Sequence, residues 1–237
     1  MLLEVEGIDT YRGPAHILHG VSITVDADEV VALVGRNGAG RTTIIESITG
    51  LLPVHAGHIR FRGEEITGLP PHRRATRGIG YAPENSGIFP ELSVAENLMI
   101  SRWLAIKTER GAAADANAER LDAVFPEVRQ LSARQGINLS GGQKKMVAIA
   151  RAMALAPYLL ILDEAFEGLA PVVVKRFRDA VLTIKSMGIA LLIADSNLTS
   201  AAAIADRLYV VDRGEIVFHG TPAEALANEE VMRVLRG

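Results

Sequence analysis

The segment Gly35–Thr43 carries the first residues whose types and spacing could do chemistry. It follows the apolar run Val30–Val34 and contains three glycines, a cation and a hydroxyl in close succession. Glycines let a backbone fold tightly enough to aim successive N–H groups at phosphate oxygens, and a helix beginning near Thr42 adds the positive end of its dipole. The spacing predicts a phosphate-binding loop in which the Thr42 hydroxyl serves Mg²⁺. The loop residues are Gly35, Arg36, Asn37, Gly38, Ala39, Gly40, Arg41, Thr42 and Thr43. The alternative is a glycine-rich turn that binds nothing.

Arg41 stands where this loop pattern has lysine. Lysine is a compact point charge on a flexible stem, whereas arginine is a planar fork with a bulkier head. Because the positive charge is kept, we expect binding of phosphate to persist. The placement of that charge against the β- and γ-phosphates is expected to change, and the rate of phosphoryl transfer depends on this placement.

A second candidate site follows the apolar run Tyr158–Leu162, which ends at Asp163 and Glu164. An acid at the carboxyl end of a parallel strand, beside a phosphate loop, can hold the water shell of Mg²⁺. We predict that Asp163 serves Mg²⁺ and that Glu164 polarises the attacking water as a general base. Two exposed acids at a strand end are the alternative, and the phosphate loop earlier in the chain favours the functional interpretation.

The third segment is Leu139–Gln143, with the sequence Leu-Ser-Gly-Gly-Gln, and it precedes a helical stretch over 144–154. Ser140 is predicted to cap that helix, and Gly141 and Gly142 let backbone N–H groups come close to a ligand. A plain helix cap is the alternative, which five residues alone leave open.

The elements that position the three candidate segments are short apolar runs that alternate with helix-compatible segments. Val30–Val34, Leu159–Leu162 and Ala190–Ala194 are continuous apolar runs, as in strands buried on both faces, whereas Val21–Val25 alternates like a half-buried strand. The series predicts an α/β fold with a mostly parallel sheet. Early strands such as Ile59–Arg62 are expected to form an antiparallel β subdomain at one side.

The middle of the chain, residues 92–155, is rich in Ala, Leu, Glu and Arg. Helix propensity predicts a mostly helical subdomain inserted between two strands of the core. The core then comprises residues 1–91 and 156–237, and residues 1–237 are predicted to form a single domain. Thr221–Glu224 predicts a further helix start, with Pro222 at the first helical position.

Composition excludes several classes of protein. The chain has 237 residues with 25 basic and 28 acidic side chains, and this balance argues against a nucleic-acid partner, although a local basic patch is compatible with it. The absence of cysteine excludes disulfides and thiolate metal sites. No apolar stretch approaches the roughly 20 residues that span a bilayer, and no basic leader opens the chain. The six histidines show no metal-ligand spacing, and His55 and His58 are expected on a loop surface.

Taken in order and over essentially the whole chain, these three motifs resemble the nucleotide-binding domain of ABC transporters. The resemblance implies a P-loop NTPase (RecA-like) core, ATPase activity coupled to transport, and ATP with Mg²⁺ as ligands. It implies that two such domains meet head to tail. Each ATP would then lie between one phosphate loop and the partner's copy of Ser140, Gly141, Gly142 and Gln143.

The resemblance assigns roles to further positions. Tyr11 falls where an aromatic ring stacks on adenine, with simple packing as the alternative. Glu84 falls where most relatives have a glutamine that contacts Mg²⁺ and the membrane subunit, with a solvated loop acid as the alternative. Ser196 falls at the position of a histidine that contacts the γ-phosphate; serine is too short for direct contact, and a water could bridge. Glu167–Pro171 falls in the loop that communicates across the dimer.

Within the family, four segments resemble the ATPases of branched-chain amino acid importers and their urea or amide relatives: Gly80–Glu84, Ile88–Pro90, Val94–Leu98 and Phe166–Pro171. This implies permease subunits as partners, a substrate-binding protein as an indirect partner, and a homodimer or a heterodimer with another ABC ATPase. It also implies a cytoplasmic subunit held peripherally on the inner face of the membrane through its permeases.

Four departures from the family pattern qualify these expectations. Ala165 replaces a proline and Asp28 replaces a glycine, and each is expected to alter only a turn. Arg41 and Ser196 together predict slowed hydrolysis. One alternative is therefore a regulatory subunit that binds ATP and scarcely hydrolyses it. Another is a non-transport ABC ATPase, although such proteins usually carry two tandem domains or a long coiled-coil insertion.

Overall fold

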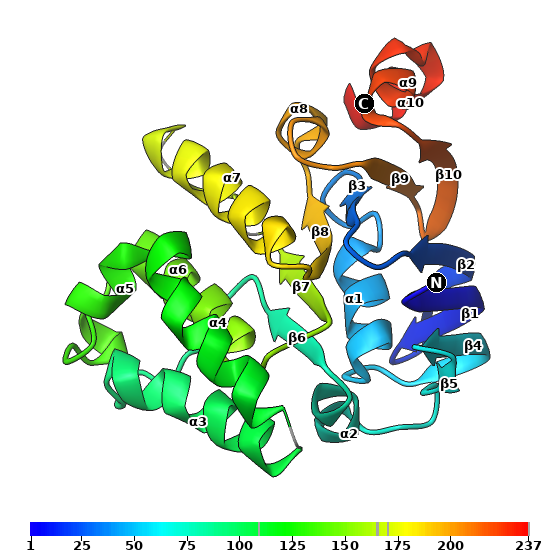
Figure 1. Ribbon diagram of the computed structural model, residues 1–237. Helices are drawn as coiled ribbons and strands as arrows, with labels where there is room; N and C mark the ends of the chain where they lie inside the picture. Colours follow the sequence, from blue (N-terminus) through cyan, green and yellow to red (C-terminus); the bar gives the residue numbers. More distant parts are fainter. Residues whose placement is uncertain (109, 165, 170, 237) are drawn as a thin grey trace. The chain divides into compact units, whose positions relative to one another are not determined.

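The computed structural model describes residues 1–108, 110–164, 166–169 and 171–236. The chain divides into two compact units, Met1–Arg74 with Ala190–Gly237 and Ala75–Ile189. The single-domain organisation, with its helical subdomain over 92–155, stays a prediction. Figure 1 follows the chain from its blue N-terminus to its red C-terminus.

The first unit contains a four-stranded antiparallel sheet in the order β2-β1-β4-β5 (Figure 1). Its strands are β1 (Leu3–Arg12), β2 (Ala15–Val25), β4 (Val54–Phe61) and β5 (Glu64–Glu65). Val5 lies opposite Ile59 across the β1–β4 ladder, and Leu3, Val5, Ile59 and Phe61 are all buried. The prediction of an antiparallel sheet around Ile59 is confirmed.

A second group of strands in the first unit carries the buried apolar runs. These strands are β3 (Val30–Val34), β8 (Ala190–Asp195), β9 (Arg207–Asp212) and β10 (Glu215–Gly220). β3 pairs in parallel with both β8 and β9, and β10 pairs antiparallel with β9. Every residue of Val30–Val34 is fully buried, as expected for a strand covered on both faces. The strand predictions for 30–34 and 190–194 are confirmed.

The helices of the first unit are α1 (Arg41–Thr49), α8 (Leu198–Ala202), α9 (Pro222–Ala227) and α10 (Glu229–Arg236), while α2 (Pro71–Thr76) begins in it. Leu198, Ala225 and Val231 bring the last three helices of the chain against β3 and β9 in one core cluster. Thr221 caps α9 through a capping box with Glu224, which confirms the predicted helix start. Among the described residues, no helix combines the length and apolarity that crossing a bilayer requires.

The second unit joins two parallel strands to a group of helices (Figure 1). β6 (Ile79–Ala82) pairs with β7 (Leu159–Asp163), and the elements between them are α3 (Val94–Lys107), α4 (Gly111–Val124), α5 (Pro126–Gln130), the 3₁₀ turn η1 (Gly136–Asn138) and α6 (Gly141–Met153). α7 (Pro171–Ser186) follows β7. Phe177 packs against Phe125 with ring centroids 5.5 Å apart, and both rings are buried. The prediction of a mostly helical stretch between two strands is confirmed.

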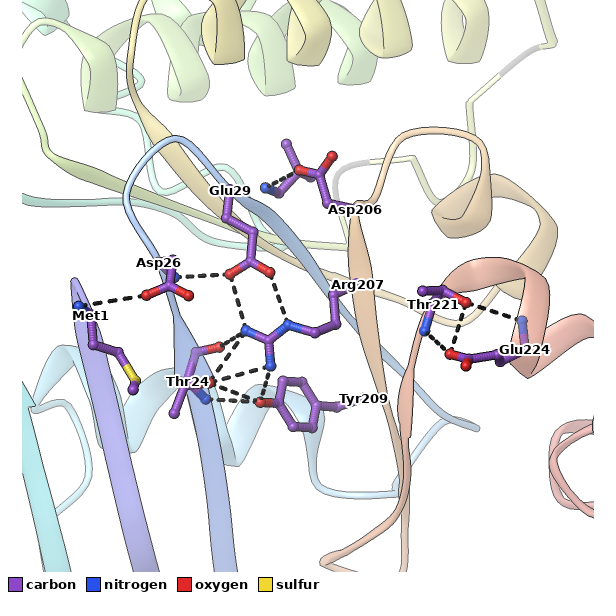
Figure 2. A network of polar contacts seen from close by, with 10 residues as sticks. Met1, Thr24, Asp26, Glu29, Asp206, Arg207, Tyr209, Thr221 and Glu224 are labelled. Carbon is purple, nitrogen blue, oxygen red and sulfur yellow. Dashed lines mark hydrogen bonds and ion pairs between the residues drawn. The ribbon is translucent and has the colours of Figure 1, made fainter.

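A polar network ties the start of β3 to β2 and β9. Figure 2 shows the carboxylate of Glu29 facing the guanidinium of Arg207, whose Nε donates to Glu29 Oε1 at 2.8 Å and whose Nη2 donates to Oε2 at 3.0 Å. Arg207 also donates to the carbonyl of Thr24 and to the Tyr209 hydroxyl. The hydrogen bond to Glu29 raises the pKa of Arg207 above its ordinary value. Bidentate pairing of this kind fixes geometry as well as charge, so it anchors the strand that leads into the phosphate loop.

Arg74 closes the C-terminal end of α1. Its guanidinium donates to the carbonyls of Ser47 at 2.6 Å, Ile48 at 2.8 Å, Thr67 at 2.7 Å and Leu69 at 2.8 Å. Arg74 is only 2% exposed, and burial lowers its pKa to about 10. The last carbonyls of a helix have no partner within the helix, so this buried cation satisfies them and complements the negative end of the helix dipole.

We expect Arg74→Met to lower the free energy of unfolding by about 3 kcal/mol, because it leaves buried carbonyl groups without their donor. Urea denaturation followed by circular dichroism measures the change. Arg73→Met is the matched control: Arg73 is exposed on the same helix, and its loss should change stability by less than about 0.5 kcal/mol. Equal effects of the two substitutions would show that Arg74 does not support α1.

Candidate nucleotide-binding site

The predicted phosphate loop connects β3 to α1 in the first unit. Gly35 follows β3 directly, and a β-carbon there would lie 2.4 Å from the carbonyl oxygen of Val211, so only glycine fits beside β9. Gly40 has a φ of +115°, a conformation that favours glycine, and α1 begins at the next residue, Arg41. The prediction of a helix beginning near Thr42 is confirmed.

The loop has the features that a phosphate group needs. Arg36, Asn37 and Gly38 are exposed, whereas Ala39 and Gly40 of the same loop are buried. Gly40 occupies the N-cap position of α1 and has no side chain to cap the first turn. The helix therefore presents its leading N–H groups and its positive dipole end at the loop, which suits an anion.

The guanidinium of Arg41 forms a hydrogen bond within its own loop. Its Nη2 donates to the side-chain oxygen of Asn37 at 3.1 Å, and the residue is 4% exposed. A guanidinium fixed by a neighbour in the same loop is less adaptable than an ammonium on a flexible stem. Arg41, which replaces the usual lysine, is thus held by Asn37 of the same loop.

Arg12 joins the end of β1 to the first turns of α1. Its Nε donates to the Thr43 hydroxyl at 3.1 Å, and its Nη2 pairs with the carboxylate of Glu46. Thr42, the predicted Mg²⁺ ligand, lies in the first turn of the same helix. It stands between Arg41, which contacts Asn37, and Thr43, which contacts Arg12. The contact to Thr43 brings β1 beside the beginning of α1.

Tyr11 lies next to Arg12 and takes part in a cluster of rings. Its ring is stacked on His16 with centroids 4.3 Å apart, and it meets His55 edge-on at 4.7 Å. His16 Nε2 lies 3.3 Å from a carboxylate oxygen of Asp9, whose pKa is held below its ordinary value, chiefly by a hydrogen bond from the Gly20 N–H. The cluster is built across β1, β2 and β4.

The placement of His55 and His58 on a loop is wrong. Both are exposed, as expected, but they belong to β4, which is longer than the Ile59–Arg62 run indicated. Histidine, glycine and alanine at 55–58 hide the strand in the sequence, and pairing with β1 produces it. Tertiary pairing therefore outweighs weak local strand propensity here.

Ser196 lies at the same edge as the phosphate loop. Val34, the last residue of β3, is the register partner of Asp195, the last residue of β8, so Gly35 and Ser196 follow neighbouring strands directly. Ser196 is exposed in the bend before α8, and Asp195 accepts a hydrogen bond from the Asn197 N–H at 2.8 Å. The parallel sheet thus places Ser196 where side chains from carboxyl ends of strands gather.

The second unit brings together three acidic residues at the ends of β6 and β7. Among the described residues, carboxylate oxygens of Glu84, Glu164 and Glu167 all lie within 4.8 Å of one another. Ala82 and Leu162 are register partners in the parallel pair, so Glu84 and Glu164 follow neighbouring strand ends. Asp163 closes β7 and is 2% exposed. The sequence singled out Glu84 and Glu164 separately, and the structure places them side by side.

The Leu139–Gln143 segment forms the start of α6. The Gln143 N–H donates to the Ser140 hydroxyl at 3.3 Å, and the Ser140 N–H donates to the Gln143 side-chain oxygen at 2.9 Å, which together make a capping box. The predicted N-cap at Ser140 is confirmed. Gly141 is exposed, and apart from its chain neighbours and its own helix no atom of the described residues lies within 4 Å of the position that a β-carbon would occupy, so this first turn is open on one side.

Two residues that sequence reasoning passed over hold the loops of this unit. Asn97, fully buried in α3, donates to the carbonyls of Phe89 and Ser93 and accepts from the Phe89 N–H, which fixes the loop after Glu84. Lys145 Nζ donates to the carbonyl oxygens of Glu164 and Glu167. Ala165, for which an altered turn is expected, lies outside the described residues. So does Ala170 of the predicted dimer loop.

Comparison with known proteins adds to this geometry. A family model described as "ABC transporter" matches residues 18–167. The chain is 37% identical over 229 residues to the lipopolysaccharide export system ATP-binding protein LptB of Escherichia coli (strain K12), which covers 96% of this chain and 93% of the relative. It is 34% identical over 230 residues to the high-affinity branched-chain amino acid transport ATP-binding protein BraG of Pseudomonas aeruginosa, covering 97% of each. Among solved structures, an ATP-binding cassette of an ABC transporter in its ADP conformation has a TM-score of 0.83 and 28% identity over 100% of this chain and 98% of that one.

Proposed function

Because the chain belongs to the ABC transporter family, whose ATP-binding subunits couple ATP hydrolysis to transport, we propose that it drives an importer for branched-chain amino acids or related small amides. The observation that carries the importer assignment is the likeness to BraG along nearly the full length of both chains. The segments Gly80–Glu84 and Phe166–Pro171 support it from the sequence. Permease subunits and a substrate-binding protein are the partners that this proposal requires.

In the first unit, we assign ATP binding to the phosphate loop and its surroundings. Backbone N–H groups of the loop and of the first turn of α1 would hold the phosphates, and the Thr42 hydroxyl would serve Mg²⁺. Tyr11 would stack on the adenine, with His16 as its present stacking partner. Ser196, at the adjoining strand end, would reach the γ-phosphate through a water.

In the second unit, we assign the acids and the α6 start to hydrolysis. Asp163 and Glu84 would serve the Mg²⁺ that accompanies ATP, and Glu164 would act as general base toward water. The open first turn of α6, with Ser140, Gly141, Gly142 and Gln143, would meet the ATP held by a partner domain, since an uncovered helix start suits an anion. Such pairing needs a homodimer or a heterodimer with another ABC ATPase, located on the cytoplasmic side of its permeases.

One observation favours a different transport direction. The likeness to LptB is as extensive as that to BraG, so an export subunit for a lipid substrate is the second candidate. A regulatory subunit that binds ATP and scarcely hydrolyses it is a further alternative. The hydrogen bond from Arg41 to Asn37 supports it, because it restrains the cation that would follow the charge on the transferring phosphate.

Reconstitution separates these candidates. The full-length chain, with the permease subunits that co-purify with it, is placed in liposomes, and Glu164→Gln in the same preparation serves as the inactive control. The importer proposal expects ATP-dependent uptake of labelled leucine or acetamide when the binding protein is added. ATP-dependent release of lipopolysaccharide from the liposomes, without uptake of leucine or acetamide, would favour the export candidate. Hydrolysis that depends entirely on a second ATPase subunit would favour the regulatory one.

A further inference from the structure

Lys145 connects the beginning of α6 to the turn that follows β7. Its ammonium Nζ donates to the carbonyl oxygen of Glu164 at 2.6 Å and to that of Glu167 at 2.9 Å. The side chain is half-buried, and both acceptors belong to the segment that carries the proposed general base. Hydrogen bonds from a charged donor are shorter and stronger than those between neutral groups, so these two contacts hold the turn firmly.

The turn needs such support because its backbone is unusual. Glu164 has a φ of +49°, in the left-handed region that residues with a side chain rarely adopt. A backbone hydrogen bond from the Glu167 N–H to the Glu164 carbonyl is long, at 3.3 Å. Backbone conformations of this kind persist where the surroundings determine them, and Lys145 engages both ends of this turn.

The Glu164 side chain lies in a group of three acids. Its carboxylate lies within 4.8 Å of those of Glu84 and Glu167, and like charges at this separation repel one another. A cation bonded to the same turn offsets that repulsion while it fixes the main chain. Lys145 therefore acts on the two properties that a general base needs, its position and its local charge.

The same helix links Glu164 to the segment proposed to meet the partner's ATP. Ser140 and Gln143 form the capping box at the start of α6, and Lys145 lies two residues after Gln143. A shift of the α6 start on closure of a dimer would therefore reach the turn at Glu164 through the Lys145 side chain.

We propose that Lys145 is a positioning residue for Glu164, which couples the start of α6 to the geometry of the attacking water. The proposal rests on the proposed function, in which Glu164 is the general base. In this proposal Lys145 acts through the backbone of Glu164 and is assigned no contact with the reacting groups.

The test compares Lys145→Met, Lys145→Arg and the control Lys144→Met in the full-length chain. Methionine keeps the length and helix propensity of lysine and removes the donor, and Lys144 is the half-buried neighbour one residue earlier. ATP turnover gives kcat and KM. Amide hydrogen exchange of peptides that cover the turn after β7 reports on that turn without nucleotide and without turnover.

We expect Lys145→Met to lower kcat by about tenfold or more, because small misplacements of a reacting group are costly, while KM for ATP changes less than about twofold. Exchange in the turn should rise in Lys145→Met only, and Lys145→Arg should recover most of the turnover. Unchanged exchange in Lys145→Met, or faster exchange with kcat preserved, overturns the proposal. A parent protein that does not hydrolyse ATP would contradict the proposed function, and the exchange comparison would still decide whether Lys145 holds the turn.

Discussion

Replacement of Glu164 by glutamine should lower kcat for ATP hydrolysis by about 100-fold or more, since a general base contributes about 10²–10⁴-fold to a rate. Glutamine has the size of glutamate and keeps one acceptor oxygen, so the turn and the binding of ATP should be preserved. KM for ATP is then expected to change by less than about twofold, as for an interaction made only in the transition state. Steady-state turnover and nucleotide binding measured on the same preparation check both statements.

Glu167→Gln provides the matched control for this prediction. Glu167 is exposed, and its carboxylate belongs to the same group of three acids, so the control removes an identical charge from the same place. It should leave kcat within about threefold of the parent, because Glu167 has no proposed part in proton transfer and a single exposed charge contributes little. A loss as large as that of Glu164→Gln would assign the effect to the charge of the acidic group, and full activity of Glu164→Gln would remove Glu164 from the role of base.

The parts of the site that are contiguous in the chain could be predicted from the sequence. A buried strand, a glycine loop and a helix start follow one another at 30–43, and each step constrains the next. The capping box at the start of α6 is likewise local, since Ser140 and Gln143 are three residues apart on a helical turn. The shared strand edge of Val34 and Asp195 follows from parallel pairing of two apolar runs.

The contacts between distant side chains could not be predicted in this way. Lys144 and Lys145 are the same residue type in adjacent positions, and only the phase of α6 against β7 selects Lys145 for Glu164, 19 residues away. Tyr11 meets His55 because β4 pairs with β1 through an irregular register between Glu6 and Asp9. A one-residue change of register reverses the faces of a strand, and no local pattern specifies where such an irregularity falls.

Arg41→Lys should raise kcat by about tenfold, and the double variant Arg41→Lys, Ser196→His should be faster still. The guanidinium of Arg41 is committed to Asn37, and its bulk and planarity limit how it can follow charge that develops on the transferring phosphate. Lysine keeps the charge on a stem that can adjust, and histidine at 196, at the adjoining strand end, restores a side chain long enough to reach the γ-phosphate. Turnover is compared at equal ATP occupancy, so that a change in affinity is not read as a change in rate.

Arg36→Lys is the matched control, because it makes the same chemical exchange in the same loop at an exposed position. It should leave kcat nearly unchanged, which would separate the effect of position 41 from a general effect of lysine in the loop. Asn37→Ala in the Arg41 background adds a test of the contact itself: release of the guanidinium should recover part of the gain if the contact restricts it. Equal or lower turnover of Arg41→Lys at the same occupancy would mean that the fork of Arg41, held by Asn37, already serves the transition state as well as an ammonium does. The slow-hydrolysis expectation would then be wrong for this loop, and the cause of any slow turnover would have to lie at Ser196 or in the turn that Lys145 holds.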